Sequence, residues 1–379
     1  MPASTQILES RVICRQPGRY IGWPTIAKAA DGELFIVFSG DRDAHVDPFG
    51  KTCFMRSADN GATWSEAVVI NDTPLDDRDA GICIAPDGAL VVSWFTSHYD
   101  DYLAMTHYCE GEEARWQEAV AGVSENDVAR WTHADSGVAA GRRMGYWTRR
   151  SSDRGETWED PVPSICCTPH GPIVLSDGRM LFVGTANFAR EEGEACLGAA
   201  ESRDNGRSWE LIGRIKSLPE LPGPSGEGYT YLGEPHAIEV EPGRILGMAR
   251  FEDRRGPNVE RMPSLLWQFT SDDGGRTWTE PWRTEILGKP PHLARLSDGR
   301  VLLTYGYRHQ PYGQRACLSS DGGETWDYAD EIVLRDDGPS GDLGYPASVE
   351  CDDGSILTVY YQQENLEEKT VLMATRWRV

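Results

Sequence analysis

Short apolar runs recur along the chain, and each follows a turn that ends in glycine. The turn glycines are Gly32, Gly88, Gly178, Gly243, Gly299 and Gly354, and the runs that follow span residues 34–38, 90–94, 180–183, 245–248, 301–305 and 356–360. Apolar runs of this length beside a glycine turn are typical of β-strands. Eight residues before each glycine stand Pro24, Ala80, His170, Pro235, Pro291 and Pro346, and proline suits the first residue of a strand. The pattern therefore predicts six units, each opened by two strands and a tight turn.

A second motif, Ser-x-Asp-x-Gly-x-(Thr/Ser)-Trp, occurs five times. Its copies span residues 57–64, 151–158, 202–209, 271–278 and 319–326. The Ser and Asp side chains suit bonds to turn amides, the glycine suits a positive φ, and the tryptophan suits packing into a sheet. We therefore predict a structural turn between the third and fourth strands of a unit, outside any active site.

Six four-stranded units indicate an all-β protein, a six-bladed β-propeller formed by residues 1–379 as a single domain. The last unit has only three strands after Tyr345 and no copy of the second motif. Residues 7–14 have the alternation of one strand. We expect this segment to be the outer strand of the last blade, because it would close the ring and remove an open edge.

Blade 2 carries an insertion at about 96–141, which explains why the second and third strand starts are the furthest apart. Within it, residues 112–120 are good helix formers, and Ser124 to Asp127 resembles a capping box. We expect a helical excursion over one face of the ring, either as surface decoration or as a lid over the substrate.

The amino-acid composition limits which binding partners and which cellular location we expect for the protein. The formal net charge is −23, and an acidic surface repels nucleic acids and anionic membranes. No apolar stretch has the length of a transmembrane helix, and the first residues lack the features of a signal peptide. The nine cysteines are scattered without a CxxC motif, as expected for reduced thiols. We therefore expect a cytoplasmic protein without metal or cofactor, and the oligomeric state stays open.

The innermost strands of a propeller start near its axis, so residues distant in sequence meet there. The residues just before the six predicted starts are Trp23, Asp79, Pro169, Glu234, Pro290 and Tyr345, and His170, His236 and His292 lie at or just after a start. Charged side chains beside prolines at strand starts are poor choices for a core. The sequence therefore predicts a functional site in a central funnel.

The repeats and the funnel together resemble the sialidase (neuraminidase) superfamily, whose β-propellers carry Asp-box (BNR) repeats like the motif above. Tyr345 in Gly-Tyr-Pro matches the tyrosine nucleophile of that family. Glu234 precedes Arg250 by the spacing that the family uses for its glutamate and second triad arginine. Asp47 lies before the first Asp box, where the family keeps its acid/base aspartate, and Asp79 matches a substrate-binding aspartate. The resemblance implies an exo-acting glycoside hydrolase for a terminal acidic sugar, sialic acid or a relative.

The chemistry of a sialic acid explains such a set of residues. The sugar carries a carboxylate on its anomeric carbon, which repels a carboxylate nucleophile, so that a neutral tyrosine attacks instead. The phenol of tyrosine needs a base, and a neighbouring glutamate can take its proton. A separate aspartate protonates the leaving oxygen, and arginines hold the sugar carboxylate through paired hydrogen bonds.

The arginines of this chain depart from the pattern of the family. Gly22 stands where the family has its first triad arginine. The third arginine is either Arg308, at the end of a blade 5 strand, or Arg315, which has the better spacing to Tyr345. Arg78 is either a substitute clamp for the sugar carboxylate or a partner that neutralises Asp79.

Several other residues have two interpretations. In the loop 41–47, Arg42 is a further candidate to bind substrate, and Asp43 is the alternative acid if Asp47 is not. Trp23 would either stack on a sugar ring or plug the funnel. The three histidines would donate hydrogen bonds to sugar hydroxyls, or one would act as the base of a lyase. Because they come from different blades, no spacing supports a metal site.

Two other functions stay open. The first is a hydrolase or lyase for another acidic sugar such as a uronic acid, which the missing arginine and the three histidines favour. The second is a carbohydrate-binding propeller without catalysis, which the presence of Tyr, Glu, Asp and Arg together disfavours. In each case the partner is a small glycan or an acidic sugar.

Overall fold

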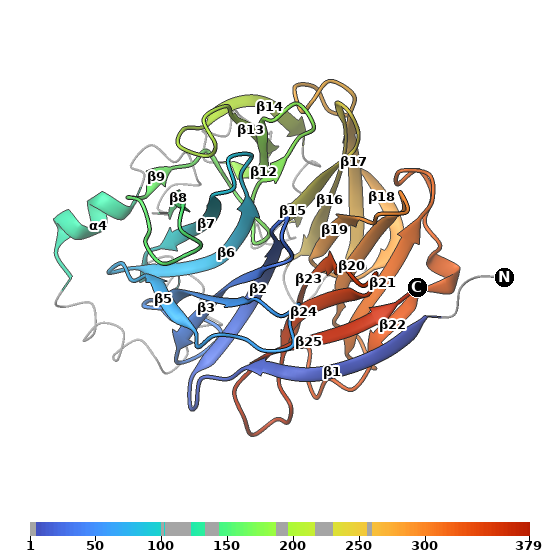
Figure 1. Cartoon of the computed structure of the whole chain (residues 1–379), viewed down its shortest axis with the longest axis horizontal. Coiled ribbons are helices and arrows are strands. Elements are labelled where there is room, and N and C mark those ends of the chain that lie inside the picture. Colours follow the sequence, from blue (N-terminus) through green and yellow to red (C-terminus); the bar gives the residue numbers. More distant parts are fainter. Residues whose placement is uncertain are drawn as a thin grey trace.

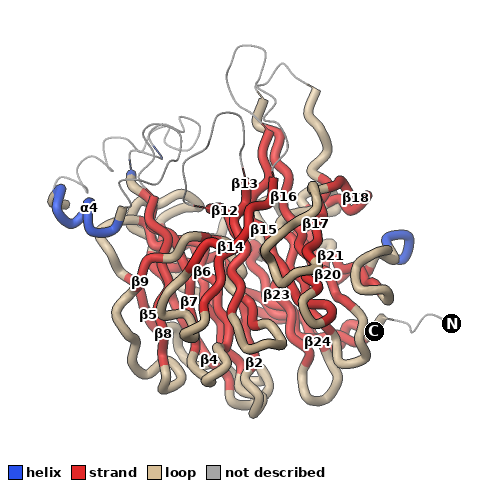
Figure 2. Tube along the Cα trace, turned by 90° about the horizontal axis from the view of Figure 1, so that it is seen from above, coloured by secondary structure: helices blue, strands red, loops and turns tan. Residues whose placement is uncertain are grey.

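The computed structural model describes residues 5–99, 102, 123–132, 144–186, 196–216, 230–255 and 260–379. Six antiparallel sheets are arranged around a central axis (Figure 1). Figure 2 shows that their strands run from one face of the ring toward the other. The predicted all-β, six-bladed propeller is therefore confirmed.

Each blade runs from an inner strand near the axis to an outer strand at the rim. Blade 1 contains β2 (Tyr20–Lys28), β3 (Leu34–Arg42), β4 (Lys51–Ser57) and β5 (Val68–Asn71), and blade 2 contains β6 (Asp76–Ile84), β7 (Leu90–Ser97), β8 (Met144–Ser151) and β9 (Val162–Pro163). Blade 3 contains β10 (Cys166–Cys167) and β11 (Ile173–Val174), which share the inner position, then β12 (Met180–Ala186), β13 (Cys196–Ser202) and β14 (Glu210–Lys216).

The second half of the ring repeats this order. Blade 4 contains β15 (Thr230–Glu241), β16 (Arg244–Asp253), β17 (Leu265–Ser271) and β18 (Trp282–Leu287), and blade 5 contains β19 (Pro291–Arg295), β20 (Val301–Tyr307), β21 (Gly313–Ser319) and β22 (Ile332–Arg335). Blade 6 contains β23 (Gly344–Glu350), β24 (Ile356–Gln362), β25 (Val371–Arg378) and β1 (Gln6–Cys14). A 3-10 helix, η1 (Tyr328–Asp330), precedes β22.

The ring is closed as the sequence predicts. Strand β1 pairs antiparallel with β25, from Gln6 opposite Arg378 to Cys14 opposite Leu372. The first and last strands of the chain therefore complete one sheet, and the closure covers an edge of β25 that would otherwise be open.

The insertion in blade 2 is helical where it is described. Helix α4 (Glu125–Trp131) follows Ser124, and the Ser124 carbonyl accepts the first helical hydrogen bond from the Val128 amide at 3.1 Å. The helix expected at 112–120 lies outside the described residues.

The hydrophobic core lies between the blades. One cluster joins Ile26 and Ile36 of blade 1 to Leu357 and Val359 of blade 6, and similar clusters fill the other gaps between neighbours. Each sheet is therefore covered on both faces, which explains why its inner strands are apolar on both sides.

The five Asp boxes are turns between third and fourth strands, as predicted. In the first copy, the Gly61 amide donates to Ser57 Oγ at 2.9 Å, and the Thr63 amide donates to Asp59 Oδ1 at 2.8 Å. Box tryptophans also connect blades, because Trp209 Nε1 in blade 3 donates to Thr148 Oγ1 in blade 2 at 2.9 Å. The boxes therefore stabilise their own turns and the contacts between neighbouring blades.

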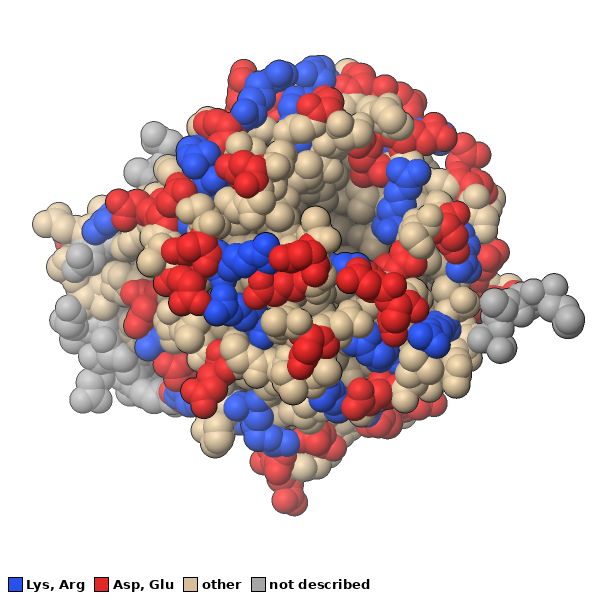
Figure 3. Space-filling model, viewed as in Figure 1, with Lys and Arg blue, Asp and Glu red and all other residues tan. Residues whose placement is uncertain are grey.

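Acidic and basic side chains are interspersed on the face shown in Figure 3, around a hollow near its middle. Among the described residues, no helix has the length and apolar character needed to cross a membrane. Seven cysteines in the described part of the chain are free thiols.

Candidate active site

Four inner strands carry the same local distortion at the same level of the ring. The register of each strand with its neighbour shifts at Trp23, Asp79, Glu234 or Tyr345. These residues have φ values between 46° and 54°, a left-handed conformation that is rare and costly for residues other than glycine. Such strain is concentrated at functional sites, and here it repeats at four of the six aligned funnel positions. Prolines occupy the other two positions, Pro169 and Pro290.

The distortion also corrects the predicted strand starts. Strands β2, β6 and β15 begin four or more residues before the predicted starts, so Trp23, Asp79 and Glu234 lie inside strands rather than before them. The spacing of the glycine turns predicted where the bulges lie and not where the strands begin. The residues before each bulge still pair with the next strand of the same blade.

Tyr345, Glu234 and Arg250 are in direct contact although they come from three different strands. The Tyr345 hydroxyl donates to Glu234 Oε1 at 2.8 Å. Arg250 Nη1 donates to Glu234 Oε2 at 2.6 Å and to the Tyr345 oxygen at 3.0 Å. A phenol thus lies against a carboxylate that can accept its proton, beside a cation that stabilises a phenolate.

Electrostatics favour a neutral tyrosine and an ionised glutamate. Burial and the charge of Glu234 raise the pKa of Tyr345 well above its ordinary value, in spite of Arg250 and Arg308. Burial also acts to raise the pKa of Glu234, but Arg250 and the two hydrogen bonds outweigh it and lower that pKa. The resting pair is therefore a protonated phenol beside an ionised carboxylate, the states in which Glu234 is free of its own proton when Tyr345 must give one up.

Arg250 is held by more carboxylates than the sequence suggested. Glu252 Oε1 accepts from Arg250 Nε at 2.5 Å, and Lys289 Nζ donates to the same oxygen at 2.8 Å. Neither Glu252 nor Lys289 was among the predicted site residues. Glu252 was recognisable in principle, because residues i and i+2 of a strand share a face.

The structure separates the two candidates for the third arginine. Arg308 lies with its guanidinium 5.7 Å from the centre of the Tyr345 ring and donates to the Leu343 carbonyl at 3.0 Å. Arg315 is buried in blade 5, where it donates to the carbonyls of Gln314 and Arg335. Arg308 therefore lies at the funnel, and Arg315 supports the outer strands of its own blade.

A carboxylate from the loop before β23 binds several groups beside Tyr345. Asp342 Oδ1 accepts from the hydroxyls of Tyr20 at 2.8 Å and Tyr361 at 3.1 Å, and it lies 3.0 Å from His45 Nδ1. The same rings lie beside Gly22, where a Cβ would be in ordinary contact with them, 3.4 Å from Tyr361 and 3.5 Å from Tyr20. Two aromatic rings thus lie beside the position at which the resembling family has its first triad arginine.

Asp79 projects into the funnel from blade 2. Its side chain is 9% exposed, and Arg78 Nε lies 3.4 Å from Oδ1. Arg78 also lies over the Trp23 ring, 4.3 Å from its centre. Of the two interpretations of Arg78, the contacts support the partner of Asp79.

Among the described residues, the hydrogen bonds of Asp47 and Arg42 join groups other than Tyr345 and Glu234. The Asp47 carboxylate accepts from the amides of Asp43 at 2.6 Å and Phe49 at 2.9 Å, so both oxygens fold their own loop. Arg42 is fully buried in an ion pair with Asp76, a contact that favours a structural role over the predicted role of substrate ligand. Arg42 is buried here because the buried carboxylate of Asp76 needs a cation beside it.

Trp23 and the three histidines are buried. Trp23 is fully buried, with its ring 5.0 Å from that of His45 and 6.3 Å from that of Tyr345, which supports a plug and not a sugar-stacking surface.

The rings of His170, His236 and His292 lie 4.5–5.2 Å apart, and these residues are 2–6% exposed. Burial lowers the pKa of His236 to about 3, so it is neutral, and its Nδ1 accepts from the Leu293 amide at 2.9 Å. The three histidines therefore pack on one another, and their hydrogen bonds to sugar hydroxyls stay a prediction. No group of three or more His, Cys, Asp or Glu with a metal-binding arrangement occurs among the described residues.

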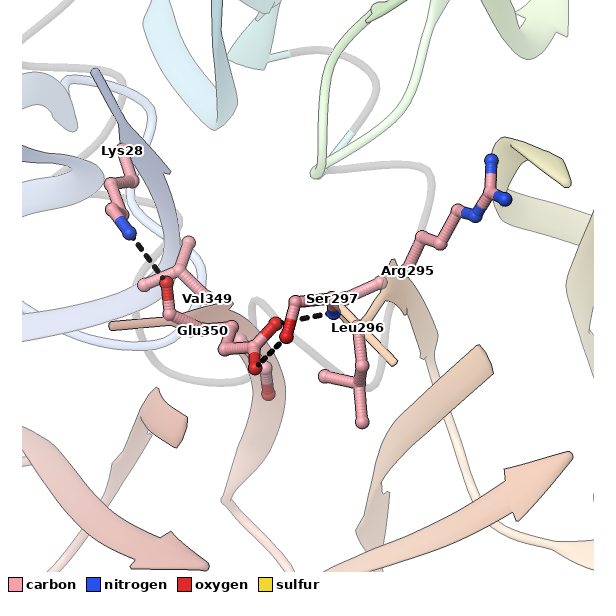
Figure 4. Close-up of a pocket in the computed structure, with 8 residues that line it drawn as sticks. Lys28, Arg295, Leu296, Ser297, Val349 and Glu350 are labelled. Atoms are coloured by element: carbon pink, nitrogen blue, oxygen red, sulfur yellow. Dashed lines mark hydrogen bonds between the residues drawn. The ribbon is translucent and has the colours of Figure 1, made fainter. Parts of the chain in front are cut away.

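A separate cavity of about 450 Å³ lies at the other end of the inner strands. Figure 4 shows Lys28, Arg295, Ser297 and Glu350 around it. The Ser297 amide and hydroxyl both donate to the Glu350 carboxylate, at 2.6 and 2.7 Å. Its polar groups therefore largely satisfy one another, and none belongs to the Tyr345 pair.

The chain matches one protein-family model, and its fold is similar to those of solved structures. A family model described as a BNR repeat-like domain matches residues 3–245. The fold is similar to a protein of unknown function from Dyadobacter fermentans, with a TM-score of 0.77 and 23% identity over 100% of both chains.

Two enzymes have the same fold at lower identity. An intramolecular trans-sialidase from Ruminococcus gnavus has a TM-score of 0.61 and 16% identity, covering 95% of this chain and 94% of that one. An α-L-arabinofuranosidase from Fusarium graminearum has a TM-score of 0.61 and 12% identity, covering 98% and 97%. No curated protein matches the sequence. At these identities the likeness shows the fold alone.

Proposed function

The chain belongs to the family of BNR repeat-like domains, and we propose that it is an exo-acting, retaining glycoside hydrolase that cleaves a terminal acidic sugar. The observation that carries the proposal is the hydrogen bond of 2.8 Å between the Tyr345 hydroxyl and Glu234, with Arg250 bound to both. A tyrosine in this setting is suited to attack a carbon that already carries a carboxylate, because a neutral phenol is not repelled.

The reaction would proceed in two steps. Tyr345 attacks the anomeric carbon as its proton passes to Glu234, and a carboxylic acid protonates the departing oxygen. Water then cleaves the glycosyl–tyrosine bond, and Glu234 returns the proton to the phenolate. Two inversions at one carbon retain its configuration.

Arg308 is the group proposed to hold the carboxylate of the sugar. It is half-buried beside Tyr345, whereas Arg250 is engaged by Glu234 and Glu252. Gly22, at the position where the resembling family has its first triad arginine, favours a second candidate, a hydrolase for an acidic sugar other than sialic acid, such as a uronic acid. The fold likeness to a trans-sialidase and to an arabinofuranosidase supports carbohydrate chemistry in general and neither sugar in particular.

The first test is release of fluorophore from a 4-methylumbelliferyl sialic acid, compared with uronic acid glycosides and a neutral arabinofuranoside. Turnover of the sialoside supports the sialidase proposal, and turnover of a uronic acid glycoside alone supports the second candidate. Cleavage of none of these, by protein with an intact thermal transition, would contradict a hydrolase and favour a carbohydrate-binding propeller.

We expect Arg308→Gln to raise KM for the acidic substrate by about ten-fold to a hundred-fold, because a charge-assisted hydrogen bond is lost. The KM of a neutral glycoside should change little. Arg315→Gln is the matched control, since that arginine is buried in the same blade away from the funnel. It should lower the midpoint of urea unfolding while leaving KM unchanged. Equal effects of both variants on KM would mean that Arg308 acts through folding.

A further inference from the structure

The geometry around Asp47 does not support this residue as the acid that protonates the leaving oxygen. Each oxygen of that carboxylate accepts an amide hydrogen bond from its own loop, and the residue is 4% exposed. Both oxygens of Asp47 therefore have partners, and both partners belong to the same loop. Asp47 therefore has a sufficient structural role in shaping the loop 43–49.

Asp79 is placed opposite the reacting pair. Tyr345 and Glu234 project from blades 6 and 4, on the two sides of blade 5, and Asp79 projects from blade 2, across the ring from blade 5. All three use the same left-handed bulge, so their side chains enter the funnel at one level. A sugar attacked from the side of Tyr345 would present its leaving oxygen on the far side, because displacement at carbon proceeds from opposite faces.

The surroundings of Asp79 suit a proton donor. Its carboxylate meets Arg78 Nε at a long 3.4 Å, whereas Glu234 is bound closely by Arg250 and Tyr345. Burial raises the pKa of Asp79 to about 6, and the charge of Glu234 adds to the rise against the opposing charges of Arg78 and Arg42. Two carboxyls whose pKa values are displaced in opposite directions are the usual mark of an acid and a base in one site.

We infer that Asp79, and not Asp47, is the catalytic acid/base of this propeller; the inference rests on the proposed hydrolase function. As the glycosidic C–O bond breaks, the Asp79 carboxyl gives its proton to the leaving oxygen, and Tyr345 Oη bonds to the anomeric carbon. In the second step the Asp79 carboxylate takes a proton from the attacking water, which restores the acid. The hydroxyl bonds to the anomeric carbon as the bond from that carbon to Tyr345 Oη breaks, and Glu234 returns its proton to the phenolate.

The test compares two glycosides of the sugar that the wild type releases: a 4-nitrophenyl glycoside, whose phenolate departs without a proton, and a methyl glycoside, whose oxygen must be protonated. Asp79→Asn should reduce kcat/KM for the methyl glycoside by about 10²–10⁴-fold and should affect the 4-nitrophenyl glycoside far less. The ratio of the two rates is measured on one sample, so it does not depend on the folded fraction.

Asp47→Asn is the matched control and should leave that ratio unchanged. A selective loss in Asp47→Asn, or an equal loss of both substrates in Asp79→Asn, would overturn the inference while the wild-type activity still supports the hydrolase. If the wild type releases neither aglycone, the proposed function itself fails.

The pH profile supplies a second readout. The charged and titratable groups around Asp79 are Arg78 and Asp76 on its own strand, Arg42 on β3, Cys167 on β10, Glu234 on β15 and Tyr345 on β23. Because the acid must be protonated, kcat/KM for the methyl glycoside should fall as the pH rises through about 6. Asp79→Asn should lose this basic limb, and a limb that persists in the variant would contradict the inference.

Discussion

Replacement of Tyr345 by phenylalanine is expected to lower kcat for the preferred acidic glycoside by about a thousand-fold or more. The change removes one oxygen, the proposed nucleophile, and leaves an aromatic ring of nearly the same shape among Trp23 and Tyr361. Glu234 keeps its ion pair with Arg250, so the buried carboxylate remains compensated. The thermal transition should therefore stay close to that of the wild type while turnover is lost.

Tyr360→Phe is the matched control for this variant. Tyr360 is also buried in blade 6, but its hydroxyl faces away from the funnel and bonds Thr375 Oγ1 at 2.8 Å and Arg335 Nη1 at 3.2 Å. The Tyr360→Phe variant should keep the activity of the wild type. Mass spectrometry after reaction with a fluorinated glycosyl fluoride should locate the sugar on the Tyr345 peptide in the wild type and on no peptide in Tyr345→Phe. Full turnover in Tyr345→Phe would remove this residue as nucleophile.

The fold was predictable because short sequence motifs determine its turns and strands. Each blade begins with a glycine turn between two apolar strands, and five blades have an Asp box whose Ser, Asp and Gly bond within eight residues, as in Ser57 to Trp64. Turn chemistry of this kind depends on neighbours in sequence and not on the rest of the fold. The closing strand β1 followed from counting strands against blades.

Part of the site was predictable for a related reason. Trp23, Asp79, Glu234 and Tyr345 are aligned relative to the glycine turns, and the shared bulge shows that the alignment has a backbone cause. The position could be inferred from spacing, but the strain at each residue could not, because its stability comes from packing against other blades.

The burial of individual side chains was not predictable. Arg42 is the last residue of β3 and Arg308 follows β20, yet Arg42 is enclosed by Asp76 from the next blade and Arg308 stays half-buried. The histidines at the strand starts likewise pack on one another across three blades. The burial of these side chains depends on contacts between residues far apart in sequence, and such contacts cannot be read from one amino-acid sequence.

Arg42→Met is expected to destabilise the protein by about 3–5 kcal/mol, the usual cost of leaving one member of a buried ion pair without its partner. Arg42 and Asp76 are both fully buried, Nη2 donates to Asp76 Oδ2 at 2.8 Å, and Asp76 joins blade 2 to blade 1 through this contact. Nη2 also donates to the Asp47 carbonyl at 3.2 Å, so the loop 43–49 should loosen together with the blade junction. Urea unfolding, followed by tryptophan fluorescence, measures the loss.

The double variant Arg42→Met/Asp76→Leu separates the charge from the packing. If the loss in Arg42→Met arises from an uncompensated carboxylate, removal of Asp76 should restore a large part of the stability, because apolar replacement of both partners is often nearly neutral. Tyr102 then loses its acceptor, Asp76 Oδ2 at 2.6 Å, which limits the recovery. A double variant as unstable as Arg42→Met would show instead that the guanidinium acts through its contacts with Trp23 and the Asp47 carbonyl.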